Sequence, residues 1–438
     1  MAVAFEKSSF NFKCTPMQKG MLFQNLIAPD DYRNHEQLQL TFTNLLDEEN
    51  VLSAVQKLTA RHDALRTTFL WDEDEEAVRV VNKSYSVECC TVEICTKQLK
   101  SYVDEQRELK FNLEKSPPIR WCHLKCDNSR SIILITLHHI LMDGASYEVL
   151  LSELLSLYMD KPLEKPSNDG IYRYVEWLER QPVTEAKKFW ADHLKHIKTG
   201  CVFGGSVPGL EYTPDSFDET IKLDISQSRK INDKCNTKGY SLANVFSAAW
   251  AMTLHDYVGY EGEVQFGVTR YGRTSLPFEC KNDVGIFINT VPLTVNLQEL
   301  NSVDLKLSVT RDSLNKLRKW EHTPLIEIEK SSPFNGQAIF DSILVFDRMP
   351  LYEQLHEYHD PCGLTGVDNL GVTHYPVTVV GKGGDNIIIS IEVDLNIVDK
   401  NTAEYCLNKL TSWIYKLLEL DPINNMTYEY KENRSWQK

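Results

Sequence analysis

The sequence predicts an α/β protein of two domains, and three observations support this prediction. Apolar runs of strand length alternate with segments of helical periodicity along the whole chain. The chain has 438 residues, which exceeds the size at which a single core keeps growing. Linker-like stretches occupy residues 159–170, with two prolines and one glycine, and residues 200–214, with four glycines and two prolines. We place the boundary near residue 180, so that residues 1–180 form an N-terminal domain and residues 181–438 a C-terminal domain.

The first half opens with a capped helix. Thr15 and Gln18 form a capping box, and Pro16 occupies the first helical position, where its missing N–H costs nothing. The elements expected next are a half-buried strand, a helix, a strand, a strand buried on both faces and an amphipathic helix: residues 38–42, 51–58, 65–70, 131–137 and 147–158.

The second half repeats this alternation. Two amphipathic helices, residues 172–179 and 184–197, are expected to connect the halves. After them the periodicity predicts helices at residues 241–257, 302–320 and 402–420, and strands at residues 264–269, 291–295, 339–346 and 387–393.

The composition argues against several classes of partner and site. A formal net charge of −15 argues against nucleic acid and against anionic membrane surfaces as partners. The chain opens without a signal-peptide pattern, and its apolar runs are shorter than a membrane span. The eleven cysteines lack the spacing of zinc knuckles, so we expect reduced thiols, a cytoplasmic protein and no bound metal.

Two adjacent histidines, His138 and His139, stand between the predicted buried strand and the helix that follows it. Side chains in such a turn are held rigidly and can face a cleft. Neighbouring residues of an extended segment point to opposite sides, so the pair can hardly bind one zinc ion. The same alternation lets one ring face inward, fixed by hydrogen bonds, while the other faces the cleft and serves in catalysis. A purely structural histidine pair is the alternative.

Asp143 and Gly144 follow the histidines at the start of the helix. Asp143 can cap the helix and accept backbone amide protons, and we expect it to form a buried ion pair with Arg66 as well. The N–H of Gly144 is expected to stay free at the helix N-terminus. The helix dipole there favours the developing negative charge of an oxyanion.

The stretch His138–Gly144 resembles the HHxxxDG signature of the condensation domains of nonribosomal peptide synthetases. The superfamily of these domains also contains chloramphenicol acetyltransferase. Further stretches resemble the other motifs of that family in the same order: residues 15–23, 61–69, 172–177, 266–273, 284–290, 322–325 and 340–346. The resemblance runs from about Phe12 to about Leu420, nearly the whole chain.

The resemblance implies two chloramphenicol-acetyltransferase-like subdomains that form a V-shaped pseudo-dimer with a central tunnel. In that family an acceptor amine attacks a carrier-bound acyl thioester near the second histidine, here His139, with His138, Asp143 and Gly144 completing the catalytic group. The enzyme itself stores no cofactor, because the phosphopantetheine arms belong to the donor and acceptor peptidyl carrier proteins. The acceptor is either carrier-bound or a free small-molecule amine, and a monomer is expected.

Further residues receive roles from the same resemblance. Asn289 falls in residues 284–290, the block that crosses between the halves in that family, so we expect it to reach the joint and bind substrate. The alternative is a strand-end asparagine that satisfies local backbone groups. Ser146 is also expected to bind substrate, and Arg66 to be structural at the site. Candidates for a carrier-docking patch are Lys13, Lys19 and Arg33.

Departures from the family pattern narrow the subtype. Heterocyclising relatives replace the histidine pair, whereas this chain keeps both histidines. Epimerising relatives carry a glutamate just ahead of the Gly-Arg pair, and this chain has no glutamate just before Gly272 and Arg273. The opening block resembles that of domains that accept D-configured or epimerised donors. The alternative is that Met21, Leu22 and Phe23 are simply core residues of the helix.

Two other functions stay open. One is an ester-forming or small-molecule acyltransferase that uses an alcohol acceptor or acyl-coenzyme A. The other is a non-catalytic platform, although such members usually lose the histidine pair. The sequence permits both a free-standing enzyme and a domain excised from a longer one.

Overall fold

The computed structural model describes residues 10–29, 31–71, 76–127, 129–197, 200–204, 216–259, 262–297, 302–334, 337–371, 373–421 and 428–430. The chain is a mixed α/β protein with two compact units. The first unit comprises Met1–Gln181, Leu276–Ile288 and Leu351–His374, and the second comprises Pro182–Ser275, Asn289–Pro350 and Tyr375–Lys438. The first break at Gln181 falls beside the predicted boundary. The assignment of all later residues to the C-terminal domain is wrong, because the chain returns to the first unit twice.

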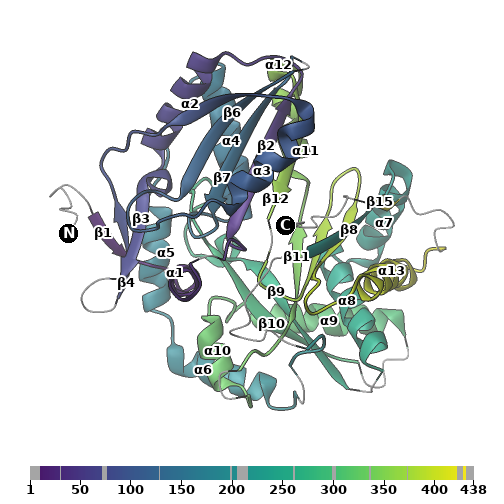
Figure 1. Ribbon diagram of the computed structural model, residues 1–438. Helices are drawn as coiled ribbons and strands as arrows, with labels where there is room; N and C mark the ends of the chain where they lie inside the picture. The colour runs from purple at the N-terminus through teal and green to yellow at the C-terminus, as the bar shows by residue number, and fades with distance from the viewer. Residues whose placement is uncertain are drawn as a thin grey trace. The chain divides into compact units, whose positions relative to one another are not determined.

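The first unit is built on a five-stranded sheet with the strand order β12-β2-β7-β6-β5 (Figure 1). In this order the strands are Leu364–Leu370, His35–Phe42, Ser131–His138, Ile119–Cys126 and Cys89–Ile94. Neighbouring strands are antiparallel, except for the parallel pair β5 and β6. Because β12 comes from the segment 351–374, the second return of the chain supplies one edge of this sheet.

Helices cover both faces of this sheet. On one face, α2 (Glu48–Arg61) and α4 (Gly144–Tyr158) share a core with Ile133 and Ile135 of β7. On the other face, α3 (Leu99–Glu108) shares a core with Ile132 and Leu134. Every residue of β7 is buried, which confirms the strand predicted to be buried on both faces.

The predicted capping box at the first helix is confirmed. Helix α1 spans Pro16–Ile27, the Gln18 N–H donates to the Thr15 hydroxyl at 3.2 Å, and the Thr15 N–H donates to the Gln18 side chain at 3.0 Å. The Gln18 amide also donates to the Ile140 carbonyl at 3.0 Å, so this helix contacts the histidine turn. The other elements of the unit are β1 (Phe10–Lys13), β4 (Ala77–Val81), β3 (Thr67–Trp71), α5 (Gly170–Glu179), α11 (Leu351–Gln354) and α12 (His359–Cys362).

The second unit is built on a seven-stranded sheet with the strand order β10-β9-β11-β13-β14-β8-β15. In this order the strands are Ile288–Asn296, Glu263–Tyr271, Ser342–Asp347, Val377–Lys382, Ile388–Asp394, Ser216–Lys222 and Tyr428–Tyr430. The helices are α6 (Val183–Leu194), α7 (Ile225–Lys238), α8 (Leu242–Val258), α9 (Val303–Leu317), α10 (Leu325–Ser331) and α13 (Lys400–Leu417). Its core includes the fully buried Phe246 and Trp250 of α8.

The long periodic helices were predicted well, whereas several other helices and strands were missed. The helices predicted at residues 241–257, 302–320 and 402–420 correspond to α8, α9 and α13. Helix α3 and strands β5 and β13 were not predicted. Most of the predicted linker at residues 200–214 lies outside the described residues. None of the described helices is long and apolar enough to cross a membrane.

Candidate active site

The histidine turn connects β7, which ends at His138, to α4, which begins at Gly144. Asp143 is the N-cap of α4 and is fully buried, and its side chain accepts the Ser146 N–H at 3.2 Å. This confirms the predicted cap. The buried strand on one side and the capped helix on the other fix the backbone of the turn.

His138 is the inward-facing histidine of the pair. Its ring is buried, and its Nδ1 accepts the Ile140 N–H at 3.1 Å, so the proton of the neutral ring lies on Nε2. The ring of His35 packs edge-on against it with 5.7 Å between the ring centroids. Burial, with a smaller contribution from His35, lowers the pKa of His138 well below its ordinary value. His138 is therefore a neutral, fixed ring.

His139 is the outward-facing histidine, with a side chain that is 21% exposed. Its Nδ1 lies 2.9 Å from the Met142 carbonyl oxygen. Because a carbonyl oxygen only accepts, Nδ1 carries a proton, and in the neutral form of the ring the lone pair therefore lies on Nε2. The His139 backbone N–H also donates to the Asn34 carbonyl at 2.7 Å. The pair therefore has the predicted arrangement, with one ring fixed inside and the other partly exposed.

Glu36 is a neighbour of His139 that the sequence analysis missed. Its carboxylate Oε1 lies 3.4 Å from Nδ1 of His139. The other carboxylate oxygen accepts the hydroxyl of Tyr147 on α4. Burial and this carboxylate raise the pKa of Tyr147 well above its ordinary value, so the hydroxyl stays a donor. The carboxylate is thus held against the same nitrogen that donates to Met142, and it reinforces the proton on Nδ1.

Two more histidines flank the turn. His35 lies 2.8 Å from the Arg107 carbonyl through Nδ1, and burial lowers its pKa to about 4. His374 lies 2.8 Å from the Asn34 side-chain oxygen through Nε2, and its pKa is lowered to about 4 by burial and by nearby Arg33. Asn34 thus binds His374 with its side chain and His139 with its backbone.

The first returning segment of the chain is bound to the turn through Asp143. The second carboxylate oxygen of Asp143 accepts the Phe287 N–H at 2.8 Å, and the Asp143 N–H donates to the Gly285 carbonyl at 3.1 Å. The Ser146 hydroxyl lies 2.9 Å from that carbonyl and accepts the Gly285 N–H at 3.1 Å. Asp143 therefore joins two distant parts of the sequence, which supports a structural role.

The predicted ion pair between Arg66 and Asp143 is wrong. The Arg66 guanidinium donates to Asp63 at 2.6 Å, to the Thr59 carbonyl at 3.1 Å and to the carbonyl of Asn82. The reason is local, because Asp63 and Arg66 belong to one 3₁₀ turn, three residues apart. Arg66 remains structural, but it stabilises this turn rather than the cap of α4.

Ser146 and Gly144 differ from each other in access. Ser146 is fully buried and its hydroxyl is bonded as described, and a contact between Ser146 and substrate stays a prediction. Gly144 is exposed, and within the described residues its N–H has no acceptor. That free donor at the first position of α4 is what the predicted oxyanion contact requires.

Asn289 belongs to the second unit, near the start of β10. Its side-chain amide donates to the Glu321 carbonyl at 2.8 Å and to the Thr323 carbonyl at 2.7 Å. Both amide protons are therefore used by backbone groups of the same unit, as in the alternative of a strand-end asparagine. A contact between Asn289 and substrate stays a prediction.

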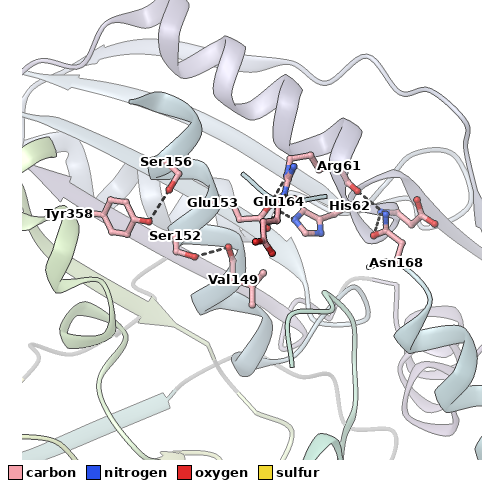
Figure 2. Close-up of polar contacts among 10 residues, drawn as sticks. Arg61, His62, Val149, Ser152, Glu153, Ser156, Glu164, Asn168 and Tyr358 are labelled. Atoms are coloured by element: carbon pink, nitrogen blue, oxygen red, sulfur yellow. Dashed lines mark hydrogen bonds and ion pairs between the residues drawn. The ribbon is translucent and has the colours of Figure 1, made fainter. Parts of the chain in front are cut away.

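Arg61 and His62, at the start of the block at residues 61–69, contact α4 (Figure 2). Glu153 of α4 accepts from Arg61 at 2.8 Å, and it lies 2.8 Å from Nε2 of His62. Farther along α4, the Ser156 hydroxyl lies 2.9 Å from the hydroxyl of Tyr358, which belongs to the second returning segment. These contacts fix the helix whose first turn carries Asp143 and Gly144.

The three basic residues expected to form a docking patch all have acidic partners. Lys13 lies 2.7 Å from Glu179, Lys19 lies 3.7 Å from Glu76, and the Arg33 guanidinium lies 2.5 Å from Asp31. Such pairs neutralise the local charge, so the three residues do not form a purely basic surface.

Comparisons with known proteins show which family the chain belongs to. The model of the condensation domain family matches residues 11–420. One polypeptide of the linear gramicidin synthase of Brevibacillus parabrevis is 30% identical over 417 residues, which cover 91% of this chain and 5% of that protein. Gramicidin S synthase 2 of Brevibacillus brevis is 25% identical over 406 residues, which cover 89% of this chain and 9% of that protein. The chain therefore spans only a small part of the length of these relatives.

Solved structures share the fold. The condensation domain of the monacolin K polyketide synthase MokA superposes with a TM-score of 0.77 at 14% identity, covering 94% of this chain and 98% of that one. The first condensation domain of the calcium-dependent antibiotic synthetase, in complex with a substrate analogue, gives a TM-score of 0.76 at 15% identity, covering 94% and 97%.

Proposed function

Because the chain belongs to the condensation domain family, we propose that it forms amide bonds in nonribosomal peptide biosynthesis. In this reaction an acceptor amine attacks an acyl or aminoacyl thioester held by a donor carrier protein. The observation that supports the proposal best is the state of His139. Its Nδ1 proton is held by Met142 and Glu36, which leaves the Nε2 lone pair for the substrate.

The reaction needs a base and a site for negative charge. As the amine attacks the thioester carbonyl, Nε2 of His139 takes up the amine proton, and the same proton can later reach the leaving thiolate. The carbonyl oxygen becomes an oxyanion, which the free N–H of Gly144 and the N-terminus of α4 are suited to stabilise. Asp143 and His138 hold this geometry without touching the reacting atoms.

The donor thioester is a substrate and not a resident cofactor. Its phosphopantetheine arm is supplied by the carrier protein, and the acceptor is a second carrier or a free amine. The V-shaped arrangement of the two units around a tunnel, and a monomeric state, are parts of this proposal that rest on the family resemblance.

An ester-forming acyltransferase is the second candidate. A neutral Nε2 can take a proton from a hydroxyl group as well as from an amine, so the site itself does not choose between them. A non-catalytic platform is disfavoured, because both histidines of the motif are present and the side chain of His139 is partly exposed.

A carrier-loading assay tests the proposal. Donor carrier protein is loaded with aminoacyl groups and incubated with the chain and a panel of amine and alcohol acceptors, and products are identified by mass spectrometry. Amide products that depend on His139 are expected. Ester products alone, or equal turnover of acyl-coenzyme A and carrier-bound donors, would replace the proposal with the second candidate.

A further inference from the structure

A pair of cysteines lies on the face of the first unit's sheet that α3 covers. Cys90 of β5 and Cys122 of β6 are direct partners in the parallel register of these strands. Side chains of paired residues in neighbouring strands point to the same face. Tyr102 of α3 confirms this orientation, because its hydroxyl lies 4.0 Å from the Cys90 sulfur and 3.6 Å from the Cys122 sulfur.

The spacing of the two strands suits a disulfide. Paired Cα atoms of adjacent strands lie about 5 Å apart, which falls inside the range of Cα separations that disulfides bridge. The Cys90 sulfur is further positioned 3.5 Å from the Trp121 carbonyl oxygen. The register of β5 and β6 therefore places the two cysteines within the range that a disulfide can bridge.

The two thiols differ in access and in acidity. Cys90 is exposed and Cys122 is buried. Hydrogen bonds from Cys122 and then from Tyr102 lower the pKa of Cys90 to about 6, against the opposing effect of burial. The same hydrogen bond and burial raise the pKa of Cys122. These opposite shifts favour a thiolate at the exposed Cys90 beside a protonated thiol at the buried Cys122, which is the arrangement found in redox-sensitive cysteine pairs.

We propose that Cys90 and Cys122 form an oxidation site that a hydroperoxide converts to a disulfide. The Cys90 thiolate attacks the peroxide O–O bond, its sulfur is oxidised to a sulfenic acid, and the other oxygen leaves as water or an alcohol after taking up a proton. The Cys122 sulfur then attacks the sulfenic sulfur, the S–O bond breaks, and the hydroxyl leaves as water with the Cys122 proton.

The site is separate from the proposed chemistry of the histidine turn. It lies on β5, the edge strand of the sheet, and on its neighbour β6. The disulfide would tie that edge strand to the sheet, and a thiol reductant would reverse it.

The test uses the full chain and hydrogen peroxide. Native protein is treated with peroxide, remaining thiols are alkylated, and the peptides are mapped without reduction. A peptide pair linked through Cys90 and Cys122, lighter by two hydrogens than the separate peptides, is expected. In the Cys122→Ser variant, dimedone should instead trap a sulfenic acid at Cys90.

The Cys89→Ser variant is the matched control. Cys89 is adjacent in sequence but points to the other face of the sheet, and burial raises its pKa to about 12. This variant should form the Cys90–Cys122 disulfide like the parent protein. The proposal is overturned if peroxide oxidises other cysteines of the native parent protein before Cys90, or if Cys90 is oxidised without linking to Cys122.

Discussion

The two faces of the first unit's sheet hold two neighbouring histidines in different ways. On the α3 face, His138 is buried against another histidine and bonded to a backbone N–H. On the α4 face, Glu36 reaches His139 with a carboxylate. One ring is therefore a neutral structural group, whereas the other has a fixed tautomer beside a negative charge. Side chains alternate between the two faces along a strand, and this alternation continues into the turn. The two adjacent histidines therefore have different environments and different roles.

The largest effect should come from removing the outward histidine. His139→Ala should lower single-turnover amide formation by about 10²–10⁴-fold, the usual contribution of a positioned base. Its melting temperature should stay near that of the parent protein, because the side chain is partly exposed. His138→Ala is the matched variant and should lower the melting temperature, since it empties a buried position. Near-normal turnover in the His139→Ala variant would show that His139 is not the catalytic base.

Next in size is the loss of the cap that joins the histidine turn to the returning segment. Asp143→Ala leaves the Phe287 and Ser146 N–H groups without this acceptor, and a buried unsatisfied group costs about 1–3 kcal/mol. Chemical denaturation measures the loss in the free energy of unfolding. Combined with Arg66→Ala the losses should add, because the two residues have separate partners. If the loss in the double variant differs clearly from the sum of the two single losses, Arg66 and Asp143 interact after all, against the structure.

A smaller effect is expected from neutralising the carboxylate on the α4 face. Glu36→Gln keeps an oxygen for the Tyr147 hydroxyl but removes the charge beside His139. Outer partners that orient a functional histidine typically contribute about 10–100-fold in activity, so kcat should fall by about that factor with little change in KM. Glu148→Gln, which changes an exposed carboxylate on α4, is the control. If both variants behave alike, Glu36 does not position His139.

The effect that is smallest near neutral pH concerns the pH dependence of stability on the α3 face. Folding lowers the pKa of His35 to about 4 by burial, whereas an unfolded histidine titrates near 6.5. Between these values the unfolded chain binds more protons, so acid lowers the free energy of unfolding. The contribution of His35 is complete above about pH 6.5 and declines toward pH 4, by at most about 1.4 kcal/mol per pH unit.

Denaturation at several pH values checks this. The stability advantage of the parent protein over His35→Gln should shrink as the pH falls through that window. His196→Gln, which changes an exposed histidine, should leave the pH dependence unchanged. A constant difference between the parent protein and His35→Gln would contradict the buried neutral state of His35.

Features set by local sequence could be predicted. The capping box at Thr15, the cap at Asp143 and the buried strand ending at His138 follow from residue types within a few positions of one another. Glu36 also had a signal, because it alternates in phase with Leu38 and therefore stands on a core-facing side of its strand. A carboxylate at such a position indicates a buried polar partner.

Features that depend on distant pairing could not be predicted. Nothing near Gly285 or Phe287 in the sequence indicates that their backbone groups bind Asp143. His374 reaches Asn34 only because the chain returns to the first unit after Leu351. The prediction for Arg66 failed for the opposite reason. Its partner is the neighbouring Asp63 in the same turn, whereas the prediction chose the distant Asp143.

The interleaved path of the chain also has a consequence for biosynthesis. During translation, the sheet of the first unit cannot receive its edge strand β12 until residue 370 has left the ribosome, long after the histidine turn has been made. Until then β2 is an unpaired edge strand of the nascent N-terminal segment, and such an edge can pair with strands of other chains. A gene fragment that stops at residue 181 would encode a polypeptide that lacks β12, so the edge of β2 would stay unpaired.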